Sequence, residues 1–195
     1  MVAMRYSCLA VAVSLAGLIG SAPLSAASFS PTPEEMQEAI RVGQRSVVSE
    51  EFGGEWQLVN PSGESLTVMT PFYRVALAAR NAAFKSETLK PREVETLLNE
   101  TKGRLVLWVW LHGNRADFAR WYQPVLVLPD REEVKPTFVQ NERTALRLEN
   151  GRYQARCLYS FPIEGLRPTA RVTLLVRDVE SRDVARFMVD LSTMR

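Results

Sequence analysis

Hydrophobic and polar residues alternate along three successive runs within residues 153–191. The runs read YQARCLYSFPI, ARVTLLVRD and DVARFMVDL. Successive side chains on a β-strand point to opposite faces, so strict alternation predicts strands with one buried face. The segment GLRP after the first run predicts a crossing, and RDVESRD predicts a hairpin turn between the last two strands.

The run RLVLWVWLH at 104–112 is apolar on both faces. A strand that is covered on both sides has a nearly continuous hydrophobic sequence, so we expect a central strand. One face can meet a second sheet and the other can receive helices. We interpret Trp108 and Trp110 as core residues rather than as a platform for a sugar or a base, because aromatic side chains contribute heavily to interiors.

Helical periodicity appears in three segments. A capping box at Thr32 and Glu35 opens the first segment, and Gly43 indicates its frayed end. The strongest helix, PFYRVALAARNAAFKS at 71–86, has an alanine-rich face that predicts close packing on a sheet. A further helix is expected from 91 to about 100.

Short strands broken by turn residues fill the remaining chain. Residues 57–68 predict a hairpin around an Asn-Pro-Ser-Gly turn. VLVLPD, EVKPTFVQ and TALRLEN follow the central strand, and Pro136 indicates an edge or a bulge because proline cannot donate to a ladder. Regularly spaced short strands with turn signals are typical of a β-sandwich.

The expected fold class is therefore α+β and β-rich. We expect an immunoglobulin-like antiparallel β-sandwich with two or three helices packed on one side. A chain of 195 residues is long enough for one sizeable core. The predicted organisation is a single domain over 28–195 with a helical insertion at about 71–100, preceded by a separate segment at 1–27.

Residues 1–27 have the pattern of an export signal. Arg5 precedes a mostly apolar run at 8–20, and the small residues Ser25, Ala26 and Ala27 follow it. The apolar run is shorter than the ~20 residues of a spanning helix, which favours a cleaved signal peptide over a retained anchor. We expect a Sec-type signal cleaved near Ala27, a periplasmic or secreted protein, and no stable membrane span.

Charge and cysteine content narrow the function classes. The chain has 24 basic and 22 acidic side chains, a net charge of +2, so nothing indicates a nucleic-acid partner. Cys157 is the only cysteine after the export segment, which excludes an intrachain disulfide there. It shares a strand face with Tyr159 and Phe161, which predicts a buried, inert thiol rather than a nucleophile or an intermolecular bridge.

One loop, HGNRADFARWYQP, gathers the candidate binding residues. Loops carry function more often than the scaffold does, and Trp, Tyr and Arg dominate binding hot spots. A single histidine without a second histidine or a nearby cysteine is poor metal-ligand spacing. Asp117 and Arg120, three residues apart, predict a local ion pair. The candidate residues are His112, Asn114, Arg115, Asp117, Arg120, Trp121 and Tyr122.

The preferred functional hypothesis is a non-enzymatic periplasmic protein that acts as a protein–protein interaction or structural module. Its partner would be an envelope or periplasmic protein, and no cofactor is expected. The alternative is a small-molecule or metal-binding periplasmic protein that uses the 112–124 loop, with His112, Asp117 and Glu132 as ligands. No serine or cysteine stands beside the histidine as a nucleophile, which disfavours an enzyme. A hydrolase with paired carboxylates is a third, less favoured class.

Three segments carry a resemblance: TPFYRVALAARNAAF, HGNRADFARWYQPVLVL and RCLYSFPIEGLRPTARVTLLVRD. Together they resemble a group of uncharacterised exported proteins of Gram-negative bacteria, over most of the chain from about Pro33 onward. The last two strands also resemble the closing strands of immunoglobulin-like and fibronectin-like modules, without the Cys-Trp-Cys pattern of antibody domains. The first resemblance implies export to the periplasm, and the second implies a β-sandwich.

Overall fold

The computed structural model of the protein describes residues 27–195. The expected export segment, residues 1–26, lies outside the described residues. Ala27, where cleavage is expected, is described: it is fully buried, and its N–H donates to the carbonyl of Leu191 at 3.0 Å.

Three α-helices lie within residues 27–195: α1 (Pro33–Arg45), α2 (Pro71–Phe84) and α3 (Pro91–Thr101). Each begins with a proline, whose fixed φ suits the first turn and whose missing N–H is not needed there. The capping box is confirmed, because the Thr32 amide donates to Glu35 Oε2 at 2.6 Å and the Glu35 amide to Thr32 Oγ1 at 3.2 Å. In this part of the chain no helix combines the length and apolar character that a membrane crossing requires.

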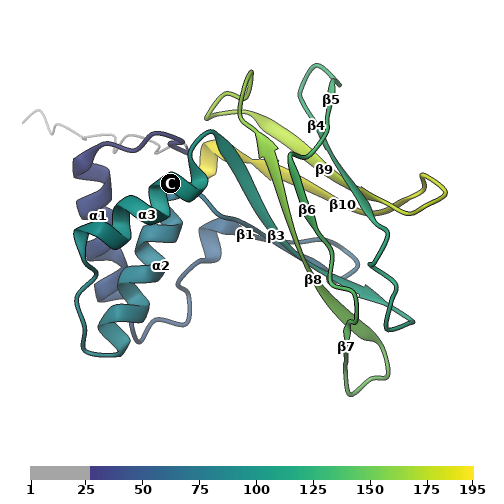
Figure 1. Cartoon of the computed structure of the whole chain (residues 1–195), viewed down its shortest axis with the longest axis horizontal. Coiled ribbons are helices and arrows are strands. Elements are labelled where there is room, and N and C mark those ends of the chain that lie inside the picture. Colours follow the sequence, from purple (N-terminus) through teal and green to yellow (C-terminus); the bar gives the residue numbers. More distant parts are fainter. Residues whose placement is uncertain (1–26) are drawn as a thin grey trace, which may run out of the picture.

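The strands that follow form two antiparallel sheets (Figure 1). They are β1 (Gln57–Val59), β2 (Ser65–Val68), β3 (Arg104–Gly113), β4 (Gln123–Val127), β5 (Glu133–Val134), β6 (Phe138–Gln140), β7 (Leu146–Arg147), β8 (Tyr153–Pro162), β9 (Arg171–Arg177) and β10 (Asp183–Asp190). The larger sheet has the order β1-β2-β3-β8-β6, with β7 also paired to β8. The smaller sheet has the order β10-β9-β4-β5.

Strand β3 is central in the larger sheet, as its doubly apolar sequence predicts. It pairs with β2 on one side and with β8 on the other, and Leu107 lies opposite Tyr159 and Val109 opposite Cys157. The expected face of β8 is confirmed, because Cys157 is fully buried together with Tyr159 and Phe161.

The inward faces of the two sheets share one hydrophobic core. Alternate residues of β3, β8, β9 and β10 supply it, so the period of two seen in the sequence corresponds directly to burial. Its strand residues include Leu105, Leu107, Val109, Leu111, Leu126, Ala155, Val172, Leu174, Val176, Phe187 and Val189. Buried residues of the helices, among them Met36, Phe72 and Val75, belong to the same cluster as those of the two sheets.

Two of the segments in which the chain crosses from one sheet to the other contain proline. Pro136 lies between β5, the edge strand of the smaller sheet, and β6, an edge strand of the larger sheet. Pro136 itself belongs to no strand, so it lies in the connection between two edge strands and not inside an edge strand or at a bulge. The segment after β8, which contains GLRP, carries the chain back to β9 in the smaller sheet, so the predicted crossing is also present.

The helices lie together on one side of the sheets (Figure 1). The expected packing of the alanine-rich face of α2 on a sheet is wrong, because this face packs on α1. The expectation that Gly43 marks a frayed end is also wrong. A Cβ at Gly43 would lie 2.1 Å from the carbonyl oxygen of Ala76 and 2.9 Å from Ala79 Cβ. Gly43 is buried at the closest approach of the two helices.

An aromatic cluster joins the helices to the sheets. The ring of Trp56, just before β1, stacks on Tyr73 at 4.5 Å between centroids and on Phe72 at 6.1 Å. Trp56 Nε1 and Thr70 Oγ1 both donate to the carbonyl of Arg195, at 2.7 and 2.5 Å. The fold class is therefore α+β, with three helices and two antiparallel sheets over the described residues.

Candidate functional site

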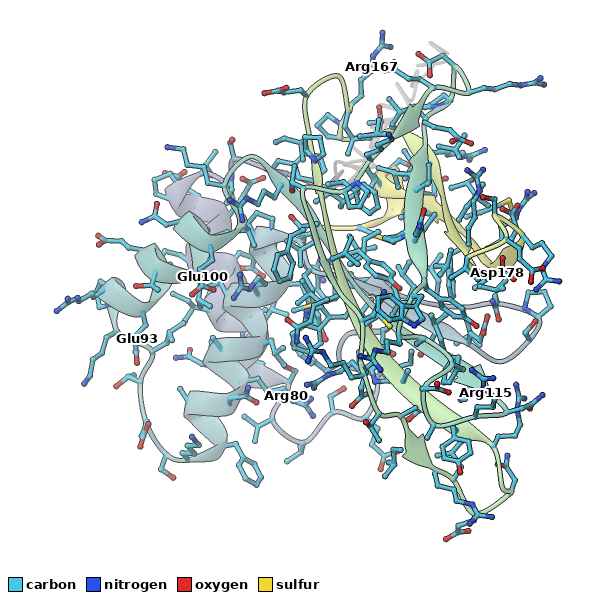
Figure 2. The ribbon with its side chains drawn as sticks, turned by 45° about the vertical axis from the view of Figure 1, so that its right-hand side comes forward. Arg80, Glu93, Glu100, Arg115, Arg167 and Asp178 are labelled. Atoms are coloured by element: carbon cyan, nitrogen blue, oxygen red, sulfur yellow. The ribbon has the colours of Figure 1, made fainter. Side chains whose placement is uncertain are left out.

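The predicted binding loop connects β3 to β4 and so passes from the larger sheet to the smaller one. Figure 2 shows Arg115, in this loop, on the side of the molecule away from the helices. The structure divides the seven predicted residues into two groups. Asn114, Arg115, Asp117, Arg120 and Trp121 are exposed, whereas His112 and Tyr122 are half-buried.

Trp121 is the most exposed aromatic side chain of the loop, at 64% of its surface. The guanidinium of Arg120 lies over its ring, 4.9 Å from the centroid. The predicted Asp117–Arg120 ion pair is wrong, because Asp117 instead pairs with Arg115 at 3.2 Å. Arg115 therefore has a carboxylate as its partner, and Arg120 has an aromatic ring.

Tyr122 anchors the loop instead of projecting from it. Its ring meets Phe118 edge-on at 5.8 Å, and its carbonyl accepts from Asn141 Nδ2 at 2.8 Å. The other end of the Asn141 amide, Oδ1, accepts from the hydroxyl of Tyr159 at 3.0 Å. Burial, followed by the negative charges of Glu64 and Asp178, raises the pKa of the Tyr122 phenol. Tyr122 therefore packs under the loop as a neutral phenol, next to the exposed Trp121.

Gly113 explains how the loop leaves the sheet so tightly. A Cβ at this position would lie 2.2 Å from Phe118, so only glycine lets the ring fold back over the end of β3. Phe118 and Ala119 pack inward, whereas the polar residues on either side of them, Asp117 and Arg120, face the solvent.

His112 is a poor centre for a metal site in this arrangement. Its Nε2 lies 3.2 Å from the side-chain nitrogen of Gln154, within hydrogen-bond distance. The structure does not bring His112, Asp117 and Glu132 together. Over residues 27–195, no three His, Cys, Asp or Glu side chains are close enough to hold a metal ion.

The Cys157 thiol is enclosed by the core between the sheets. It is fully buried, and burial raises its pKa above the usual range of a thiol. The neighbouring Tyr159 phenol has a pKa raised well above 10.0, chiefly by burial. Reactive cysteines are thiolates at accessible, electropositive positions, and Cys157 has neither property.

A groove that sequence reasoning missed lies on the outer face of the larger sheet. Trp108 and Trp110 are half-buried on this face: Trp108 packs against the core as a partly buried residue, whereas the interpretation of Trp110 as a core residue is wrong. The groove has a volume of about 480 Å³ and reaches from the sheet to the helices. It is lined by Met69, Arg74, Glu100, Arg104, Val106, Trp108, Phe138, Leu158 and Ser160. The signal was present in the sequence as the continuous apolar run of β3, which predicts two apolar faces but not what covers each of them.

A larger hollow, of about 750 Å³, lies between α2 and α3. Lys85, Glu87, Lys90 and Glu93 contribute to its lining and are exposed. Glu93 already accepts from the Lys90 amide at 2.7 Å as part of the cap of α3. The polar groups of this hollow are thus solvated or used in the helix cap, and they do not converge on a point.

Comparison with known proteins identifies no family for this chain. No family model matches, and no curated protein matches. Among solved structures, one match is a novel protein of unknown function from Burkholderia pseudomallei. The match covers 84% of this chain and 91% of that chain, with 8% sequence identity and a TM-score of 0.43. The candidate sites are therefore interpreted from their own geometry.

Proposed function

We propose that the protein is a non-enzymatic periplasmic interaction module that binds an envelope or periplasmic protein through Trp121 and Arg120. The observation that carries the proposal is the 64% exposure of Trp121, with Arg120 stacked on its ring. A large aromatic side chain and an arginine are the residue types that contribute most to hot spots in protein interfaces.

The surroundings of Trp121 support this role. Contacts of Tyr122 with Asn141 and Phe118 hold the loop next to Trp121. The loop is therefore already ordered before a partner binds. A preorganised contact loses less side-chain and loop entropy on binding than a flexible one does. The near-neutral net charge of +2 favours a partner recognised through apolar and hydrogen-bonding contacts over a highly charged one.

A capture experiment tests the proposal. The tagged protein is used to capture partners from a native envelope extract, and the candidate is then purified and its affinity for this protein is measured. Trp121→Ala is expected to weaken that affinity by roughly 30-fold or more, the size of a hot-spot residue.

Phe84→Ala is the matched control. Phe84 is an exposed aromatic residue of similar accessibility, 77%, at the end of α2. Its removal is expected to leave the affinity unchanged. A partner that binds wild type and Trp121→Ala equally well would remove the loop from the interface and refute the proposed site.

Two finer properties belong to the same proposal. We propose that the two sheets form an immunoglobulin-like sandwich, which their shared core supports. An experimental structure with the mean strand directions of the sheets near 90°, rather than within about 30°, would contradict it. We also propose export with cleavage near Ala27. Amino-terminal sequencing of protein recovered from the periplasm of a Gram-negative host tests this, and an uncleaved cytoplasmic product would contradict it.

A further inference from the structure

The outer face of the larger sheet carries an apolar groove that the proposed interaction loop does not use. Val106 and Trp108 of β3 point outward, beside Leu158 and Ser160 of β8. Val106 lies six residues before His112, the start of the loop, roughly 20 Å along an extended strand. The two surfaces are thus separate, and a function of one does not require the other.

The groove contains an unpartnered buried hydroxyl. Ser160 is 3% exposed and lies in the row that joins Phe138 to Val106 across three strands. Among the residues that the structure describes, its Oγ has no hydrogen-bond partner. A buried polar group without a partner is costly and is uncommon in folded proteins. An oxygen of a bound molecule would satisfy this hydroxyl.

Positive charge gathers at the same end of the groove. Arg104, two residues beyond the row of Ser160 along β3, is exposed and forms no ion pair within residues 27–195. Arg74 forms the wall on the helix side, where its guanidinium pairs with Glu100 at 2.5 Å. Figure 2 shows Glu100 on the helical side, beside the sheets. Because Glu100 neutralises the charge of Arg74, the charge of Arg104 is the unpaired one among the lining residues. It lies beside the unpartnered hydroxyl of Ser160.

The other end of the groove is apolar and aromatic. Trp108 and Leu158 lie opposite each other on neighbouring strands, and the guanidinium of Arg156 covers part of the Trp108 ring at 5.5 Å. Trp110 stands next along the same face, 6.2 Å from Trp108 between centroids. The groove therefore has a hydrogen-bonding, positive end and an aromatic end that Arg156 flanks, and together these ends are the complement of an amphiphilic anion.

We propose that this groove binds a small organic carboxylate with an apolar body. The carboxylate faces Arg104 and accepts from the Ser160 hydroxyl, and the apolar body lies on Trp108 and Leu158. A volume of about 480 Å³ falls in the range usual for small-molecule sites. The inference does not depend on the proposed partner of the loop.

Calorimetric titration of the purified protein with 4-phenylbutyrate tests the proposal. The affinity usual for ligands of this size predicts a Kd on the order of 1 mM or tighter. 4-Phenylbutanol, the neutral analogue, and 4-phenylbutylamine, the cationic one, are expected to bind progressively more weakly. Decanoate, tested in parallel, distinguishes an aliphatic from an aromatic body. An amine that binds as well as the acid would overturn the assignment of a carboxylate.

Three variants locate the site. Ser160→Ala is expected to weaken 4-phenylbutyrate about threefold to tenfold, the effect of one lost hydrogen bond. Arg104→Gln is expected to weaken it about twofold to fivefold and to reduce its salt dependence. Val106→Phe, which fills the groove from an outward-facing position, is expected to abolish binding.

Matched controls separate this site from the rest of the molecule. Arg147→Gln, an exposed arginine on β7, is expected to bind as wild type does, and so is Trp121→Ala. Binding that survives Val106→Phe would overturn the proposal. Sedimentation of the ligand-free protein supplies a further test: a dimer that Val106→Phe converts to a monomer would assign the groove to a second copy of the chain instead.

Discussion

The Gly43→Ala substitution tests the packing of α1 on α2. In an isolated helix this change is stabilising by about 1 kcal/mol, because alanine has the higher helix propensity. Here the added methyl group would lie 2.1 Å from the carbonyl oxygen of Ala76 and 2.9 Å from the amide nitrogen of Arg80. Both atoms belong to the backbone of α2, so no side chain can move aside to make room.

The magnitude follows from the displacement that the methyl group requires. Non-bonded carbon atoms are best separated by roughly 3.5–4.0 Å, so the helices must move apart by roughly 1 Å or more. Overpacking of this kind costs about 1–3 kcal/mol, and separation also weakens the contacts of the buried residues Ala39, Ala76 and Ala79. We expect the free energy of unfolding to fall by about 2 kcal/mol, which lowers Tm by roughly 4–8 °C in a chain of this size.

Urea denaturation followed by circular dichroism measures the effect, with Gly54→Ala as the control. A Cβ at Gly54 meets nothing within 4 Å, so this substitution is expected to change stability by less than about 0.5 kcal/mol or to stabilise slightly. A Gly43→Ala protein as stable as wild type would refute the close crossing of the two helices.

Two further predictions concern titrating groups. Burial and a raised pKa predict that the Cys157 thiol reacts with a disulfide reagent on the order of 100-fold more slowly in the folded protein than in urea; equal rates would show that the thiol is accessible. Hydrogen bonds from the amide of Arg182 and then from its guanidinium hold the pKa of Asp178 below its usual range. The stability that the ionised Asp178 contributes is therefore present above the usual pKa of an aspartate and is lost as the pH falls through the lowered pKa. Asp178→Asn is therefore expected to destabilise the protein at pH 7 but to match wild type near pH 2, measured by urea denaturation, and a difference that persists at pH 2 would contradict this assignment.

Local sequence was sufficient to predict the elements and the buried faces of the long strands. Alternation along β8 placed Cys157, Tyr159 and Phe161 on one face, and the structure buries all three. The Thr32–Glu35 capping box was equally predictable from the sequence, because a cap involves residues only three positions apart. Such features are determined by the period of the backbone and by hydrogen bonds between near neighbours in sequence.

The candidate site was predictable only as a loop. Its composition indicated a binding surface, but it could not show that Arg120 stacks on Trp121 while Asp117 pairs with Arg115. By sequence distance alone, Asp117 could pair with either Arg115 or Arg120. The turn at the end of β3 decides which of the two arginines it meets. The sequence also could not show that Asn141, nineteen residues from Tyr122, donates to the Tyr122 carbonyl and accepts from the Tyr159 hydroxyl.

The sequence by itself determined that residues 104–112 form a strand with two apolar faces and that a helix with a small-residue face begins at Pro71. Only the tertiary structure decided what covers those faces. The alanines of α2 meet Gly43 of α1 instead of a sheet, and the outer face of β3 keeps an open groove beside Ser160. The physical reason is that hydrophobic burial is non-directional: a pattern shows that a face avoids water, whereas its partner depends on how distant segments fit together.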